Sequence, residues 1–292
     1  MPKDHIIPKF ILRGFAINPE ANKQNQKIMI YNKETKQIKT EKIADAYALR
    51  DFNSPELEKL LAQEYESKVA KIFQRITNRA LSNKKNITLS NSEYRLLFRF
   101  FVIMWRRNDI QIDKARKMCV ELENMLKDIF GESYYDMIKP EFKNITIEDI
   151  FNEQKDELMR IFYEKSIAET NDDDPTVLKT IKYYQPFIVY NKSDIHFLLH
   201  NTYATLRYFL PKQQKEVEYT DIPSIMIYPI SNKLCFCMLF SKNEIDINQE
   251  SFNLSIETWN NNDKIKEFFI DGYITNTATS LVVDNTNVQF VK

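Results

Sequence analysis

The stretch from Tyr94 to Trp105 constrains the fold more than any other part of the sequence, because it is hydrophobic around almost its whole circumference. It follows Ser90-Asn-Ser-Glu93, a capping box in which the serine and glutamate side chains satisfy free backbone N–H groups at a helix start. A helix that is apolar on nearly every side is a buried helix. The sequence therefore predicts a largely buried rod, which we expect to continue past Asp109 toward Leu126.

Three arginines are the exception on this rod. At about 100° per residue, Arg95, Arg99 and Arg106 lie within about 40° of one another. In one interpretation their guanidinium groups form salt bridges with Glu58, Glu64 or Asp113, or mark a solvated face. In the other, they line a cleft and hold a phosphate or carboxylate group of a ligand. The sequence alone does not separate the two.

Other polar residues also fall at positions where apolar ones are expected. On the helix predicted to begin at Ser54, Glu58 and Glu64 lie inside the apolar arc, whereas Glu66 points away from it. On the last predicted helix, Asn276 shares a line with apolar residues. Because a buried polar group is costly unless it is paired, these positions indicate either a functional site or an internal polar network.

The histidines and cysteines give weaker indications. His5 is a candidate general acid or base, although a single histidine near a terminus is more often structural. His196 and His200 are four residues apart, but they fall in a region predicted as strands, where side chains at this spacing lie too far from each other to share a metal ion. Cys235 and Cys237 share one face of a predicted strand and are interpreted as core residues. No metal site is predicted.

Composition excludes several classes of protein. Lysine plus arginine equals aspartate plus glutamate, 41 each, so no net charge draws the whole molecule toward nucleic acid or an anionic membrane. With three glycines, the chain has no dinucleotide fingerprint or glycine-rich phosphate loop, and it lacks GxSxG and HExxH motifs. The sequence contains no apolar run of about 18 residues, so no membrane span is predicted. Three cysteines without a disulfide pattern favour a reducing, cytoplasmic location. The sequence does not indicate a cofactor.

Hydrophobic periodicity changes along the chain. The first part is predicted to be mainly helical, with a hairpin of strands 27–31 and 37–43, and Asp172-Asp-Asp-Pro175 ends its last helix, which starts near Thr146. Alternation then predicts strands at 187–190, 196–199, 203–209, 225–230 and 234–240, a late helix from Asp263 to about Val283, and a strand at 288–291.

This order predicts an α+β fold with a helical N-terminal half that carries a small β-hairpin, and a mostly antiparallel β C-terminal half with a late helix. We expect one unit over 1–292, with a subdivision into a mainly helical part, 1–172, and a mainly β part, 173–292.

The first fifteen residues carry a family resemblance. His5-Ile-Ile-Pro8-Lys-Phe-Ile-Leu12-Arg13-Gly-Phe15 resembles the HxxPxxxLxxF opening of the bacterial family known as domain of unknown function 4238. Weaker matches follow at Ile30-Tyr31-Asn32-Lys33, Leu57-Glu58, Glu64, Arg106-Arg107, Tyr228-Pro229-Ile230-Ser231 and Asn276. The resemblance covers nearly the entire chain and implies a shared fold, but no reaction.

The resemblance also implies a site assembled from distant segments. Its candidate catalytic residues are His5, Glu58, Glu64 and Asn276, and its candidate ligand-binding residues are Arg13, Arg99, Arg106, Arg107 and Asn201. One departure matters: relatives carry Ser-Asp where this chain has His200-Asn201. If that aspartate is a catalytic acid in relatives, this chain is altered or inactive.

The leading functional hypothesis is an enzyme acting on a phosphate-bearing substrate, either a nucleotide or a nucleic acid, as a hydrolase or nuclease. A role in phage defence or in a toxin-like system is an expectation drawn from such bacterial families. The alternatives are a non-catalytic module that binds an anionic ligand or a partner protein, and a purely structural ion network. No membrane partner is expected, and the oligomeric state is left open.

Overall fold

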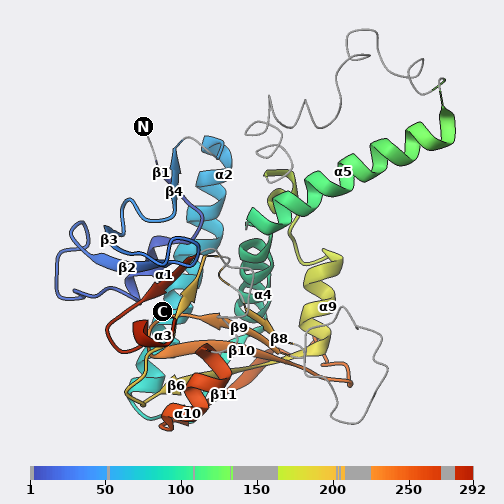
Figure 1. Cartoon of the computed structure of the whole chain (residues 1–292). Helices are drawn as coiled ribbons and strands as arrows, with labels where there is room; N and C mark the ends of the chain where they lie inside the picture. Colours follow the sequence, from blue (N-terminus) through green and yellow to red (C-terminus); the bar gives the residue numbers. More distant parts are fainter. Residues whose placement is uncertain are drawn as a thin grey trace, which may run out of the picture.

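The protein is described by a computed structural model covering residues 3–50, 53–107, 109–131, 133, 164–201, 203, 205–207, 225–270 and 280–291. The chain has an α+β fold, as predicted (Figure 1). Its helices are α1 Lys9–Arg13, α2 Pro55–Leu60, η1 Leu61–Glu66, α3 Ser67–Leu81, α4 Asn91–Arg106, α5 Asp109–Phe130, α9 Pro175–Tyr183, α10 Asn262–Ile265, η3 Lys266–Ile270 and η4 Val288–Phe290. Its strands are β1 Lys3–His5, β2 Lys27–Asn32, β3 Ile38–Lys42, β4 Ala48–Arg50, β5 Asn86–Ser90, β6 Tyr184–Asn191, β7 Leu199–His200, β8 Thr205–Arg207, β9 Ile225–Pro229, β10 Leu234–Phe240, β11 Ser251–Trp259 and β12 Ser280–Val283.

The largest sheet has six strands in the order β5-β11-β6-β10-β9-β8. Its neighbours are antiparallel except β11 and β6, which run parallel with Ile256 opposite Ile188. Strand β5 comes from the predicted helical half of the chain, whereas the other strands follow residue 172. The sheet therefore joins the two parts of the sequence.

A second sheet has four strands in the order β3-β2-β12-β7. It contains the predicted N-terminal hairpin, in which Ile30 of β2 lies opposite Lys39 of β3. On the other side of β2, Val282 of the late strand β12 pairs with Ile30. The two short strands β1 and β4 form a separate antiparallel pair, with His5 opposite Ala48.

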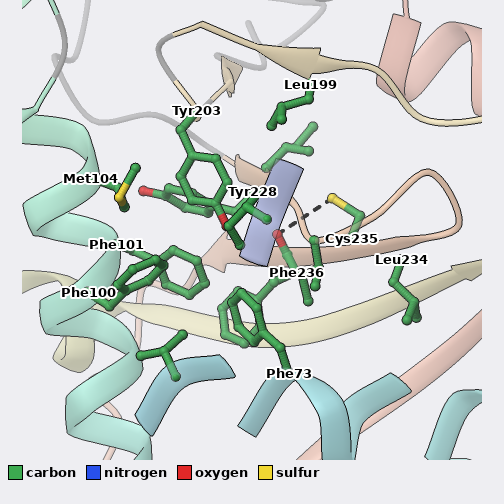
Figure 2. Packing of buried hydrophobic residues seen from close by; sticks show 14 of the residues in the cluster. Phe73, Phe100, Phe101, Met104, Leu199, Tyr203, Tyr228, Leu234, Cys235 and Phe236 are labelled. Carbon is green, nitrogen blue, oxygen red and sulfur yellow. Dashed lines mark hydrogen bonds between the residues drawn. The ribbon is translucent and has the colours of Figure 1, made fainter. Parts of the chain in front are cut away.

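Helix α4 packs against the six-stranded sheet through aromatic side chains. The rings of Tyr94 and Phe252 stack with centroids 3.8 Å apart, and Phe101 contacts Tyr228 and Phe236 at 4.2 and 4.7 Å. Figure 2 shows Phe101 facing this pair across the interface between helix and sheet. The prediction that this helix is a buried rod is confirmed, because its apolar residues from Leu96 to Met104 are at most 9% exposed.

The helical boundaries differ from the prediction at two places. The rod ends at Arg106, and Arg107 caps it with φ −79° and ψ 12°, so that α5 is a separate helix from Asp109. The long helix after Ser54 does run to Leu81, but its segment from Leu61 to Glu66 is a π-helix. The predicted helix from Thr146 lies mostly outside the described residues.

Several strand predictions need correction. The late helix was predicted to reach about Val283, but 280–283 form strand β12, and the predicted strand at 288–291 is largely the 3-10 helix η4. The predicted strand at 196–199 is limited to β7 at Leu199–His200. Short β-branched and apolar runs fit either period, so periodicity alone does not separate strand from helix there. The strands β1, β4, β5 and β11 were not predicted.

Gly14 allows the end of α1 to approach the turn between β9 and β10. A Cβ atom at Gly14 would lie 2.5 Å from the carbonyl oxygen of Ile230 and 2.8 Å from Cβ of Ser231. The Gly14 carbonyl accepts a hydrogen bond from the backbone N–H of Asn232 at 3.0 Å. The first helix and the large sheet therefore touch backbone to backbone at this point.

We expect Gly14→Ala to destabilise the protein, because the added methyl group has to push two backbone segments apart. Overpacking of this kind costs about 1 to 3 kcal/mol. Chemical denaturation monitored by circular dichroism measures the loss. An unfolding midpoint equal to that of the wild type would show that the contact between α1 and the turn is not close.

Candidate functional site

Six polar residues from four segments meet beside the N-terminal strand, and four of them, Asp4, His5, Asn53 and Arg107, are at most 8% exposed. They come from β1, the residues before α2, the helix α2-η1 and the C-terminal end of α4. We call this set the His5 cluster; its members are Asp4, His5, Asn53, Glu58, Glu66 and Arg107. Buried polar groups are nearly always bonded to something, so their contacts define what the cluster can do.

Arg107 is at the centre of the His5 cluster. Its side chain is 2% exposed, and Nη1 lies 3.4 Å from Oε1 of Glu66. Its Nη2 donates a hydrogen bond to the backbone carbonyl of His5. The guanidinium group thus joins α4, the π-helix and β1, three segments that are far apart in the sequence.

The His5 ring is held by the backbone. Its Nε2 lies 3.1 Å from the carbonyl oxygen of Ile43. Because a carbonyl oxygen only accepts hydrogen bonds, this contact places the proton of the neutral ring on Nε2. Nδ1 is then the nitrogen that can take up a proton.

Asn53 connects the other two acidic residues of the cluster. Its backbone N–H donates to Oδ2 of Asp4 at 2.9 Å, and its Nδ2 donates to Oε1 of Glu58. Its Oδ1 is buried and accepts no hydrogen bond within the described part of the chain. A buried acceptor of this kind is a place for a donor from a ligand or from water.

Glu66 is, with Asp4, one of the two carboxylates of the cluster that sequence analysis missed. Burial raises its pKa above the usual value although the nearby Arg107 opposes the shift, and the like charge of Glu58 adds to the rise. Glu64, which was predicted to face inward, is exposed and pairs with Lys68 at 2.5 Å. That prediction is wrong because the π-helix adds about one residue to a turn and so rotates the following positions by about 100°.

One tyrosine with a left-handed backbone conformation lies next to the cluster. Tyr47 has φ 52°, and its carbonyl accepts a hydrogen bond from the backbone N–H of Ile6, next to His5. Burial raises the pKa of Tyr47 to about 12, and its hydroxyl lies 3.2 Å from Oγ of Ser280. The Ser280 carbonyl in turn accepts from the backbone N–H of Asn201. Bulky residues adopt such conformations mainly where the surrounding structure enforces them, often at functional sites.

The structure therefore brings His5, Glu58 and Arg107 together, and connects the predicted Asn201 to them through Tyr47 and Ser280. Asn276 lies outside the described residues, a few positions before Ser280. Asp4, Asn53 and Glu66 were not predicted. Asp4 could have been suspected from its position next to His5, whereas nothing in the sequence pattern marked Asn53.

Arg99 and Arg106 belong to a different polar network, on the side of α4 that faces α9. Nη1 of Arg106 donates to Thr170 Oγ1 at 2.6 Å, to Asp174 Oδ2 at 2.7 Å and to the carbonyl of Ser166 at 3.0 Å. Arg99 pairs with Asp172 at 3.2 Å. The guanidinium groups of Arg99 and Arg106 are thus engaged by Asp172 and Asp174, which were not among the partners named from the sequence.

Lys9 and Arg13 differ from Arg99 and Arg106 because they have no acidic partner among the described residues. They are four residues apart at the two ends of α1, which places them on the same side of that helix. The charge of Lys9 lies near enough to Glu66 to lower its pKa. Neither residue forms an ion pair in the part of the chain that the structure describes, and the Nε of Arg13 is buried without a partner there. Lys9 is thus a positive charge near the His5 cluster, and Arg13 lies one helical turn along α1 from it.

The other histidines and cysteines have structural surroundings. His196 Nδ1 contacts Oδ2 of Asp284. His200 is fully buried, and burial, with the charge of Lys33, lowers its pKa to about 3. Cys235 and Cys237 are free and buried in the core. Among the described residues, no group of three or more His, Cys, Asp and Glu side chains is arranged to hold a metal ion, and no helix is long and apolar enough to cross a membrane.

The family model described as "Protein of unknown function (DUF4238)" matches residues 3–292. The chain belongs to this family. The match spans β1 with His5, the helix with Glu66 and the end of α4 with Arg107, so every segment of the His5 cluster lies within it. No curated protein and no solved structure matches this chain.

Substituting Arg106→Gln should destabilise the fold, because it leaves Asp174 buried, with a side chain 6% exposed, without its charged partner. Removing one partner of a buried ion pair costs about 3 kcal/mol. Denaturant titration measures the change. Lys68→Gln is the control: it removes the partner of Glu64 in an exposed pair and should cost about 0.5 kcal/mol or less. Equal losses in the two variants would contradict this assignment.

The raised pKa of Glu66 predicts a pH dependence. A carboxyl group whose folded pKa lies above its usual value of 4.5 contributes stability at low pH, and this contribution is lost as the pH rises through the folded pKa. Glu66→Gln resembles the protonated form, so its Tm relative to the wild type should be higher at pH 7 than at pH 4. Glu64→Gln, which replaces an exposed glutamate of the same helical segment, is the control. A Tm difference for Glu66→Gln that falls with rising pH would contradict the direction of the shift.

Proposed function

We propose that this protein is an enzyme that acts on a phosphate-bearing substrate, either a nucleotide or a nucleic acid, at the His5 cluster. The observation that carries the proposal is the buried guanidinium group of Arg107, which contacts Glu66, a carboxyl group of raised pKa, and the backbone carbonyl of His5. Titratable groups with perturbed pKa values that converge from distant segments are candidates for acid–base catalysis.

The two groups suit opposite roles in the hydrolysis of a phosphate ester. In this reaction the oxygen of water bonds to phosphorus, and the bond to the leaving oxygen breaks. His5, neutral with its proton on Nε2, would accept the proton of the attacking water at Nδ1. Glu66, which keeps its proton to higher pH than an ordinary glutamate, would give a proton to the leaving oxygen. One proton is taken and one is given, so the step balances.

Positive charge for the phosphate group would come from Lys9 and Arg13. In place of Arg99 and Arg106, which are paired with aspartates, these two residues carry charge that no described acidic residue neutralises. Lys9 lies close enough to Glu66 to affect its pKa, and Arg13 lies one helical turn further along. Cations near an acid–base pair can both attract and orient a phosphate. The buried Oδ1 of Asn53 would accept a donor from the same substrate.

A panel of nucleoside phosphates and of single- and double-stranded oligonucleotides, with and without Mg²⁺ or Mn²⁺, tests the proposal. We expect turnover of at least one of them, and a loss of kcat of about 100-fold or more in Glu66→Gln and in His5→Gln. Glu64→Gln, an exposed glutamate on the same helical segment, is the matched control and should keep wild-type turnover. Folded Glu66→Gln protein with full activity would refute the assignment.

The same panel distinguishes catalysis from binding alone. Absence of turnover with every substrate, together with a Tm that rises with inorganic phosphate and does so no longer in Lys9→Ala or Arg13→Ala, would identify a non-catalytic module for anionic ligands. Absence of both effects would leave the cluster as a structural network. If the protein is such an enzyme, we propose a role in phage defence or in a toxin-like system. Its test is whether the Glu66→Gln substitution abolishes protection or toxicity in bacteria that express the protein.

A further inference from the structure

A groove of about 820 Å³ lies against strands β6, β10 and β11 of the six-stranded sheet, and none of its lining residues belongs to the His5 cluster. Alternation along β11 turns Phe252, Leu254 and Ile256 toward the core and leaves Asn253, Ser255 and Glu257 exposed. The volume lies within the range of small-molecule sites in proteins, about 300 to 1,000 Å³. The groove is thus large enough for a ligand of several rings.

Aromatic side chains supply flat surfaces in the groove. Phe187 is half-buried and makes no ring contact with another described aromatic residue. Trp259 is held in one orientation, because its Nε1 donates to Oε2 of Glu257 at 3.0 Å and the ring of Phe268 packs edge-on at 5.4 Å. Fixed aromatic rings bind planar ligands with little loss of conformational entropy.

Carboxamide groups lie next to these rings. Gln185 of β6 and Asn253 of β11 are exposed and line the groove, and their side chains form no hydrogen bond with the described part of the protein. Leu239 of β10 is opposite Gln185 in the antiparallel register and is 46% exposed. Each carboxamide offers a donor and an acceptor side by side, which is the pattern that pairs with the edge of a nucleobase.

The charges of the groove select against a phosphate group. Glu244 and Glu257 contribute two carboxylates, and Lys264 contributes one ammonium group, whose Nζ already lies 3.6 Å from the centre of the Trp259 ring. Glu244 accepts a hydrogen bond from the hydroxyl of Tyr183 and lies 4.0 Å from Lys182. An uncharged planar heterocycle therefore fits this lining better than an anion.

We propose that this groove is a nucleobase-binding site, in which the base lies against Phe187 or Trp259 and pairs through its edge with Gln185 and Asn253. Stacking on aromatic rings combined with carboxamide hydrogen bonds is the chemistry by which proteins bind unpaired bases. A free nucleoside supplies such a base without a phosphate group, whereas a single-stranded nucleic acid presents the same ring on a charged backbone, and the titration below distinguishes the two sources. The inference does not depend on the proposed function of the His5 cluster.

Binding of adenosine, uridine and a short single-stranded oligodeoxyadenylate to the full chain tests this inference. A Trp105→Phe background leaves Trp259 as the only tryptophan, so quenching of its fluorescence reports on the groove directly. We expect saturable quenching, and affinity at least tenfold weaker in Leu239→Arg, which places a long charged side chain across the groove. Leu81→Arg is the matched control: Leu81 is also an exposed leucine, at 60%, but does not line the groove.

The Gln185→Ala and Asn253→Ala variants add a second test, because they should weaken binding and reduce the preference between adenosine and uridine without affecting the fold. Equal affinity for adenosine and the oligonucleotide identifies a nucleoside site, whereas tighter binding of the oligonucleotide identifies a single-strand site. Absence of quenching by all three probes, or unchanged affinity in Leu239→Arg, overturns the inference. Repeating the titration in Glu66→Gln separates the two proposals, since binding in the groove should survive loss of the His5 cluster.

Discussion

Burial of α4 against the six-stranded sheet is the interaction on which the rest of the structure depends. The helix is apolar on nearly every side, so it requires partners all around it, and the chain supplies them from segments that are distant in sequence. The ring centroids of Phe73 in α3 and Phe101 are 6.1 Å apart, and those of Tyr203 and Phe100 are 6.3 Å apart. Its contacts with Phe252, Tyr228 and Phe236 join three strands to the same helix.

The position of the His5 cluster follows from this packing. Arg107 is the residue after the buried helix, and its side chain is removed from water together with the end of α4. A guanidinium group in such a place is tolerated only when several acceptors surround it. The π-helix brings Glu66 and the N-terminal strand brings the carbonyl of His5, so the same requirement that stabilises Arg107 assembles a histidine and a carboxyl group beside it.

Sequence reasoning succeeded where one local rule decided the outcome. The capping box before α4, the proline-initiated helix after Ser54, the β2–β3 hairpin and the family to which the chain belongs were all identified correctly. It failed where the outcome depended on other segments. A helical wheel assumes uniform turns, so it placed Glu64 on the inward side of the helix, where the π-helix instead places Glu66. The role of the arginine seam could not be assigned from the sequence, because it depends on the Asp172 and Asp174 side chains that pair with Arg99 and Arg106. Asn53 and Tyr47 have no periodic signal, because their roles come from hydrogen bonds across the fold.

The place of β12 in the smaller sheet has a consequence for how the protein forms during synthesis. This strand lies between β2 and β7, yet it leaves the ribosome long after both of them. Until it arrives, β2 presents an open edge with unpaired backbone groups, and such edges invite association with other chains. Completion of this layer is therefore necessarily a late event of folding, and the nascent chain passes through a stage in which its N-terminal hairpin needs protection, either by rapid docking of α1 or by a chaperone.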